Sequence, residues 1–221
     1  MKYLKYYLLA LAVILIDQAV KLVVHENMDF GRIGEIPVLG DWFKLHYTLN
    51  NGMAFGIQFD WLYGKLSLTL FRWVAMFGIG YYIYNLIKNK QVHPGFIWCM
   101  GLVLGGAIGN VIDSTFYGVF LGNSIPLENP PPFHPWFHGR VVDMFYVDIW
   151  QGFLPEWIPI AGGNYYSFWP IFNIADAAIF VGIFTTIFRS KTFFPHEEKT
   201  RQQKQAMDEP PENVLKENNH P

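Results

Sequence analysis

Two aspartates lie in apolar stretches of the chain, where a carboxylate is costly unless it has a function. Asp143 follows Gly-Arg-Val-Val, and Asp176 follows Phe-Asn-Ile-Ala. A carboxylate in or beside hydrocarbon is strongly disfavoured unless it is paired or hydrated, so such residues commonly mark functional sites. We predict that Asp143 and Asp176 face one another and form one site.

Paired carboxyl groups are suited to acid–base chemistry. Because two close carboxyls cannot both ionise at low cost, one keeps its proton while the other is charged. The charged group can take a proton from a water that attacks a peptide carbonyl, and the protonated group can polarise that carbonyl. From the residues alone, two interpretations remain open: a peptide-hydrolysing dyad, or a small transporter or proton-relay subunit that uses intramembrane carboxylates.

Other kinds of site find little support in the composition. Cys99 is the only cysteine, so an intramolecular disulfide or a metal site built on cysteines is excluded. The seven histidines include no HExxH zinc motif, and we expect neither a metal nor another cofactor. The formal net charge of −2 gives no indication of a nucleic-acid partner.

The elements that position the aspartates are expected to be membrane helices. The chain is 52% apolar and only 15% charged, against an average of about 25% charged residues in soluble proteins. Four apolar stretches predict four transmembrane helices, at residues 3–24, 65–87, 95–117 and 168–188. Ser167-Phe-Trp-Pro170 is the expected start signal of the last one. The first stretch also resembles a signal peptide, but it contains Asp17 and Lys21 and lacks a small-x-small cleavage site, which favours an uncleaved helix.

The segments between the spans differ in character. Residues 25–64 are mixed polar and apolar with alternating stretches, which predicts a small β-rich piece outside the membrane. Residues 118–167 are rich in proline and aromatic residues, and we expect a long loop lying on the membrane surface. We therefore predict one integral-membrane domain, 1–194, followed by a disordered tail, 195–221.

The distribution of basic residues predicts the orientation in the membrane. Of the sixteen Lys and Arg residues, ten lie on the side that holds the termini, four lie on the loop side, and Lys21 and Arg72 fall within spans. By the positive-inside rule both termini are cytoplasmic, so Asp113, Asp143 and Asp176 lie at the outer face.

Several polar residues within the spans are candidates for a supporting role. Asp17 and Lys21 are four residues apart on one helix face, where they can neutralise each other. Asn110 and Asp113 share a face of the third span, beside glycines at 101, 105 and 109 that permit close helix contact. Arg72 is expected to extend towards the membrane interface.

Five motifs, taken in order, resemble those of the lipoprotein signal peptidases, the bacterial signal peptidase II family. The resemblance covers residues 1 to about 190. The motifs are Asp17-Gln-x-x-Lys21, Asn50-Asn-Gly-Met-Ala-Phe55, Gly105-Gly-Ala-Ile-Gly-Asn-Val-Ile-Asp113, Val141-Val-Asp-Met-Phe145 and Phe172-Asn-Ile-Ala-Asp176.

The resemblance implies a four-helix membrane aspartic peptidase with a β-rich cradle on the periplasmic side, in the bacterial inner membrane. Such an enzyme removes signal peptides from prolipoproteins, cleaving before a cysteine that carries diacylglycerol. Its partners would be these lipidated substrates and membrane lipids, and we expect a monomer. Asp143 and Asp176 are then the catalytic pair, and the supporting residues are Asn50, Gly52, Asn110, Asp113, Asn173, Asp17 and Lys21.

The sequence departs from the family pattern in three places, one of which is Met53, where the family has a small residue in the Asn-x-Gly motif. The family usually has an arginine directly after the aspartate of the third-span motif, and this chain has Ser114 there. We hypothesise that Arg140 substitutes for that arginine. The segment 119–139 is also longer than the usual link between the motifs, and we expect it to act as a lid over the active site.

Overall fold

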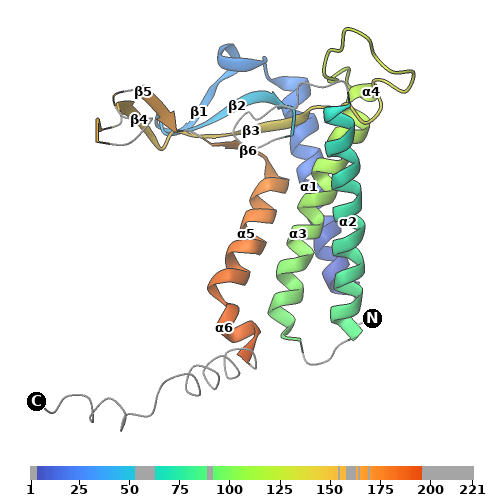
Figure 1. Ribbon diagram of the computed structural model, residues 1–221. Coiled ribbons are helices and arrows are strands. Elements are labelled where there is room, and N and C mark those ends of the chain that lie inside the picture. The colour runs from blue at the N-terminus through green and yellow to red at the C-terminus, as the bar shows by residue number, and fades with distance from the viewer. Residues whose placement is uncertain are drawn as a thin grey trace, which may run out of the picture.

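Apolar helices stand side by side beneath a small antiparallel sheet in the computed structural model of the protein (Figure 1). The structure describes residues 4–52, 63–88, 92–153, 155–157, 163, 165–168 and 170–195. The predicted disordered tail, except Pro195, lies outside these residues.

The first three spans are confirmed as long apolar helices. α1 (Leu4–Asn27), α2 (Gly64–Lys88) and the continuous helical stretch Pro94–Phe120 are each long and apolar enough to cross a bilayer. That third stretch consists of α3 (Pro94–Ile112), the π-helical turn η3 (Asp113–Tyr117) and α4 (Gly118–Phe120). α2 exposes Phe71, Val74, Phe77 and Tyr81, as expected of a helix surface that faces lipid.

The fourth predicted span begins later than the sequence suggested. The prediction placed its start at residue 168, with Ser167-Phe-Trp-Pro170 as the helix-start signal. Residues 165–168 instead form a strand, and α5 runs from Ile174 to Phe188, followed by a short α6 (Ser190–Phe193). α5 has 15 residues, a length of about 22 Å at about 1.5 Å per residue. Its crossing of the membrane therefore stays a prediction.

α3 is the central helix of the bundle because its glycines admit neighbours on two sides. A Cβ atom on Gly105 would lie 2.8 Å from the carbonyl oxygen of Ala10 in α1. A Cβ on Gly106 would overlap the carbonyl oxygen of Ala175 in α5. The predicted close helix contact along the glycine stripe is thus confirmed, and it brings α1 and α5 against the same part of α3.

The sheet lies across the ends of the helices (Figure 1). Its four antiparallel strands have the order β1 (Ile36–Leu39), β2 (Phe43–Asn50), β3 (Val141–Val147) and β6 (Ile171–Phe172). The predicted β-rich piece is therefore present as β1 and β2, preceded by the 3-10 turn η1 (Gly31–Gly34). Val142 and Met144 of β3 pack with Tyr47 and with Val24 of α1, which fixes the sheet on the bundle.

The predicted long surface loop contains more regular structure than the sequence indicated. β3 lies within it, and so do β4 (Trp150–Phe153) and part of β5 (Tyr165–Phe168), which pair as a separate two-stranded sheet. The first four residues of β3 are all buried. A strand covered on both faces lacks the alternating pattern that identifies strands in a sequence.

Candidate active site

Asp143 is held in β3 by two asparagine side chains. Its carboxyl group is almost fully buried, with 1% of the residue exposed. Asn50 Nδ2, at the end of β2, donates to Asp143 Oδ2 at 3.0 Å, and Asn173 Nδ2 donates to Oδ1 at 2.7 Å. In the antiparallel pairing of β2 with β3, Asn50 lies opposite Val141, two residues from Asp143 and on the same face of the sheet.

Asp176 lies in the first turn of α5, not about 12 Å inside the helix as the predicted start at residue 168 implied. Asn173 is the N-cap of this helix, and its side-chain oxygen accepts a hydrogen bond from the Asp176 backbone N–H at 2.9 Å. The positive end of the helix dipole favours a negatively charged side chain at this position. Asn110 Nδ2 from α3 donates to Asp176 Oδ1 at 2.8 Å.

Two amide side chains link the carboxyl groups. Asn173 Nδ2, which donates to Asp143, also lies 3.2 Å from Asn110 Oδ1, and Asn110 donates to Asp176. Burial, and next the nearby charge of Asp176, raise the pKa of Asp143 from 3.8 to about 7. The structure therefore brings together Asp143, Asp176, Asn50, Asn110 and Asn173, as the sequence predicted.

The other predicted supporting carboxylates form a separate ionic cluster. Lys21 Nζ lies 2.8 Å from Asp17 Oδ2 and 2.7 Å from Asp113 Oδ2, and all three side chains are fully buried. The predicted pairing of Asp17 with Lys21 is confirmed. Lys21 Nζ also donates to Asn110 Oδ1 at 3.2 Å, so Asn110 contacts both this cluster and Asp176.

This cluster ties four elements together. Asp17 Oδ1 accepts from the backbone N–H of Ala175 in α5 at 2.8 Å, and Asp113 Oδ2 accepts from the N–H of Val142 in β3 at 3.2 Å. Gln18 Nε2 donates to Asp113 Oδ1 at 2.9 Å, and the Tyr117 hydroxyl donates to Gln18 Oε1 at 3.0 Å. Sequence reasoning missed Tyr117 and gave Gln18 no role, although Gln18 stands inside the first motif.

Gly52 and Ser114 are both contacted by an arginine. Arg72 Nη2 donates to the Gly52 carbonyl oxygen, and Arg72 Nη1 donates to Ser114 Oγ at 2.8 Å. Arg72 thus binds protein groups beside the site, whereas the sequence suggested that it would extend to the membrane interface. The structure places Arg72, not Arg140, against Ser114. The Arg140 backbone N–H donates to Asn123 O at 2.7 Å, and its Nε has no partner among the described residues.

The segment 119–139 lies against the ends of α2 and α3 (Figure 1). The Phe137 N–H donates to Thr115 O at 3.2 Å, and Gly139 N–H donates to Ser114 O at 3.0 Å. Thr69 Oγ1 of α2 donates to Phe137 O at 2.8 Å. These contacts fix the end of the segment that leads into β3, and its role as a lid stays a prediction.

Similarity to known proteins shows the family of this chain. The family model described as signal peptidase (SPase) II matches residues 9–192. The lipoprotein signal peptidase of Amoebophilus asiaticus is 49% identical over 179 residues, which are 81% of this chain and 74% of that protein. The chain belongs to the signal peptidase II family. It is a membrane aspartic peptidase of the bacterial inner membrane.

Further relatives agree with this assignment. The lipoprotein signal peptidase of Porphyromonas gingivalis is 40% identical over 181 residues, which are 79% of this chain and 77% of that protein. Two solved structures described as a bacterial membrane enzyme, determined by the in meso method, superpose with TM-scores of 0.52 and 0.53. Both are 23% identical to this chain. The first match covers 85% of this chain and 89% of that structure, and the second covers 83% and 90%, so both support the fold.

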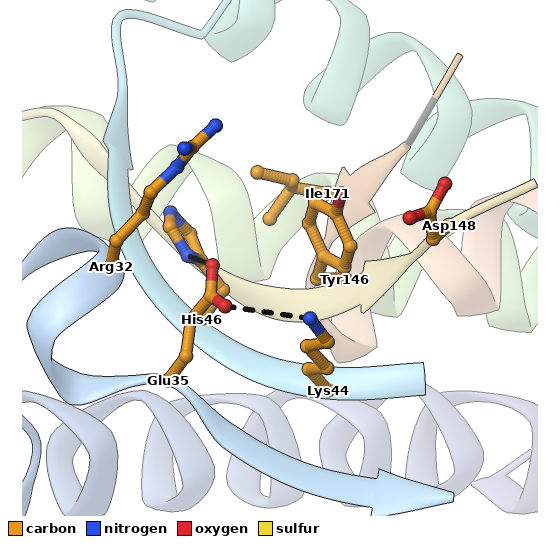
Figure 2. A pocket seen from close by; sticks show the side chains of 7 residues that line it. All are labelled: Arg32, Glu35, Lys44, His46, Tyr146, Asp148 and Ile171. Carbon is orange, nitrogen blue, oxygen red and sulfur yellow. Dashed lines mark hydrogen bonds and ion pairs between the residues drawn. The ribbon is translucent and has the colours of Figure 1, made fainter. Parts of the chain in front are cut away.

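This signal peptidase II also has a charged pocket on its sheet, separate from the two aspartates (Figure 2). The cavity of about 430 Å³ contains Glu35, which pairs with Lys44 at 3.7 Å and with His46 at 2.8 Å. Tyr146 lines it from the face of β3 opposite to Asp143, because the two residues are three positions apart in a strand. The remaining lining residues are Arg32, Asp148 and Ile171.

Proposed function

We propose that this peptidase removes signal peptides from diacylglyceryl-modified prolipoproteins by cleaving before the lipidated cysteine, with Asp143 and Asp176 as the catalytic pair. The observation that carries the proposal is the junction of β3 and α5, where the Asn173 and Asn110 amides connect the two carboxyl groups. The names of the relatives supply the substrate class, and the cleavage position is what the resemblance to the family implies.

The proton of the pair is assigned to Asp143. Its pKa of about 7, raised by burial and then by Asp176, keeps it protonated below neutral pH. Asp176, at the positive end of the α5 dipole, is the charged member. The environments of the two groups thus separate an acid from a base, which is how paired carboxylates divide their roles.

The reaction then proceeds in two steps. Asp176 takes a proton from a water whose oxygen bonds to the scissile carbonyl carbon, while Asp143 gives its proton to the carbonyl oxygen. In the second step the carbon–nitrogen bond breaks, Asp176 gives its proton to the leaving amine, and Asp143 recovers a proton from the diol as the carboxyl product forms. Both carboxyls return to their starting states, and one water is consumed for each peptide bond.

An apolar groove supports the lipid part of the proposal. It has a volume of about 330 Å³ and lies between α1 and the sheet. Met144 and Phe145, which line it, directly follow Asp143 in β3. An acyl chain held there would fix the depth of the modified cysteine close to the carboxyl pair. The other lining residues are Ala19, Val20, Val23, Val24 and Leu45.

The orientation is also part of the proposal. α1 begins and α5 ends at the end of the bundle away from the sheet (Figure 1). The excess of Lys and Arg on that side supports cytoplasmic termini and a carboxyl pair at the periplasmic face. We also propose that the enzyme acts as a monomer.

Single substitutions of the two aspartates test the catalytic pair. Asp143→Asn and Asp176→Asn should each give a folded protein that cleaves a lipidated preprotein at least about 10³-fold more slowly. Asp41→Asn, an exposed site on the same side of the molecule, serves as the control and should keep wild-type activity. Cleavage at the wild-type rate by either dyad variant would refute the assignment.

The lipid requirement is tested with one preprotein prepared with and without its diacylglycerol. The proposal predicts cleavage of the modified form only, at the bond before the cysteine, as read by mass spectrometry of the products. Equal rates for both forms would show that recognition does not need the lipid, but they would not contradict the catalytic role of the two aspartates.

A further inference from the structure

α2 carries three polar side chains on one face of an otherwise apolar helix. Lys65, Thr69 and Arg72 follow one another at intervals of four and three residues, which places them on the same side. Thr69 donates to Phe137 O at 2.8 Å, and Lys65 Nζ donates to Asn51 O at 2.8 Å. Polar groups in a membrane helix are costly, so three on one face indicate a function for that face.

Arg72 and Lys65 hold the turn that follows β2. Lys65 binds the carbonyl oxygen of Asn51, and Arg72 binds that of Gly52. Gly52 has a φ of +93°, and a Cβ atom there would lie only 2.7 Å from Arg72 Nη1. Glycine is therefore required at this position both for the backbone conformation and for the approach of the guanidinium.

The same turn orients a side chain that binds Asp143. The Gly52 N–H donates to Asn50 Oδ1 at 2.7 Å, which leaves Asn50 Nδ2 directed at Asp143 Oδ2, 3.0 Å away. An amide has one oxygen and one NH₂ group, so fixing the oxygen also fixes the donor. A continuous series of contacts thus runs from Arg72 through Gly52 and Asn50 to Asp143.

We propose that Arg72 is a positioning residue of this peptidase: by fixing the Asn50–Gly52 turn from α2, it keeps the Asn50 amide donating to Asp143. The contact of Arg72 with Ser114 secures the other half of the guanidinium at the end of α3. The inference rests on the proposed catalytic role of Asp143 and adds a group that controls that carboxyl without touching the substrate.

The Arg72→Lys variant tests whether the geometry of the guanidinium is needed, or only its positive charge. Lysine keeps the positive charge near the carboxylates but replaces a planar fork, which binds two acceptors at once, with a single ammonium. Without the oriented Asn50 donor, ionised Asp143 is less favoured. We expect kcat/KM to fall about tenfold and the alkaline limb of its pH profile to move upward by about one pH unit. An unchanged profile would overturn the proposal, whether or not the variant is less stable.

A double-substitution cycle tests whether Arg72 acts through Asn50. Asn50→Ala should reproduce the shifted alkaline limb, and Arg72→Lys should then add at most about a twofold further loss of kcat/KM. Independent losses that multiply in the double variant would show that Arg72 acts by another route and would overturn the positioning role.

Gly52→Ala provides a second variant that leaves the arginine in place. The added Cβ must displace the guanidinium, so the pH limb should move as in Arg72→Lys. Gly31→Ala is the matched control, because Gly31 also has a positive φ, of +77°, but has no atom within 4 Å of the added Cβ. Arg189→Lys, at the other end of the bundle, controls for the arginine substitution.

The outcomes distinguish this inference from the proposed function. If Asp143→Asn retains activity, the catalytic assignment fails, and the positioning role of Arg72 is refuted with it. If Asp143→Asn is inactive while Arg72→Lys and Gly52→Ala both keep the wild-type pH profile, the catalytic pair stands and only the positioning role of Arg72 is refuted.

Discussion

Asp113 and Asp143 are neighbours in space, yet their surroundings differ completely. Asp113 accepts the N–H of Val142, the residue that precedes Asp143 in β3. Asp113 shares the Lys21 ammonium with Asp17, and its Oδ2 lies 2.7 Å from Lys21 Nζ. The hydrogen-bond partners of Asp143 among the described residues are the uncharged amides of Asn50 and Asn173.

This difference supports the proposal that Asp113 is a structural carboxylate and Asp143 a catalytic one. A buried carboxylate with a bound ammonium holds its neighbours in place, because removing either partner leaves an uncompensated charge. A buried carboxylate with amide partners keeps a proton that it can give away near neutral pH. The proposed proton-exchanging carboxyl thus lies beside an ionic cluster, and Asn110 contacts both that cluster and Asp176 of the proposed pair.

Removing Lys21 should cause the largest loss of stability. Lys21→Met leaves Asp17 and Asp113 buried without their cation, which is expected to cost about 3–5 kcal/mol of stability. The loss should appear in the melting temperature of the detergent-solubilised protein. Lys44→Met is the control: Lys44 is a partly exposed partner of Glu35, and its loss should cost about 1 kcal/mol or less. Equal effects of the two variants would contradict the structural role of the cluster.

Removing the Asn110 amide should affect both the ionic cluster around Lys21 and the proposed catalytic pair. Asn110→Ala deletes an acceptor for Lys21 and a donor to Asp176. We expect a loss of about 1–3 kcal/mol in stability and a fall of about a hundredfold in kcat/KM. Stability and activity are measured on the same preparation, and a variant that loses only one of them would show that Asn110 serves a single region.

Removing the Asp143 carboxyl should stabilise the protein in a pH-dependent way. The pKa of Asp143 is raised from 3.8 to about 7 in the folded protein, so the native state binds more protons than the unfolded chain between these values. Wild-type stability therefore falls as pH rises through this window, and the penalty is complete above about pH 7. Asp143→Asn should melt several degrees higher than wild type at pH 8, with the difference vanishing near pH 4. A constant difference at all pH values would contradict the raised pKa.

The smallest effect on stability is expected at Tyr117, which lies at the edge of the ionic cluster. Tyr117→Phe removes one hydroxyl donor to Gln18, and Gln18 keeps its hydrogen bonds to Asp113 and Gly109. We expect a loss of about 1 kcal/mol in stability, with activity within about twofold of wild type. A large loss of activity would extend the catalytic region into the cluster that we interpret as structural.

Helical spacing correctly predicted which polar residues of one helix lie together. Helical periodicity placed Asp17 with Lys21 and Asn110 near Asp113, and the structure confirms both placements. The membrane character and the first three spans followed from hydrophobic length alone. These predictions succeeded because each depends on residues that are close in sequence or on a single long apolar stretch.

The failures have three different causes. The helix start of α5 was misplaced because Ser167 and Pro170 resemble a start signal, whereas the observed cap is Asn173, which was assigned only to the site. β3 was taken for loop because burial on both faces removed its alternation. The partners of Arg72 lie 20 and 42 residues away, so no local pattern could show where its guanidinium binds.

The shortness of α5 has a consequence for the surrounding lipid. Its 15 residues extend about 22 Å, less than the usual hydrocarbon thickness of about 30 Å. If α5 crosses the membrane as predicted, the lipids next to it must compress to match it, whereas α1, with 24 residues, imposes no such mismatch. Because Asp176 stands in the first turn of α5, the bilayer would then be thinned beside the proposed catalytic pair, where the scissile bond has to meet water.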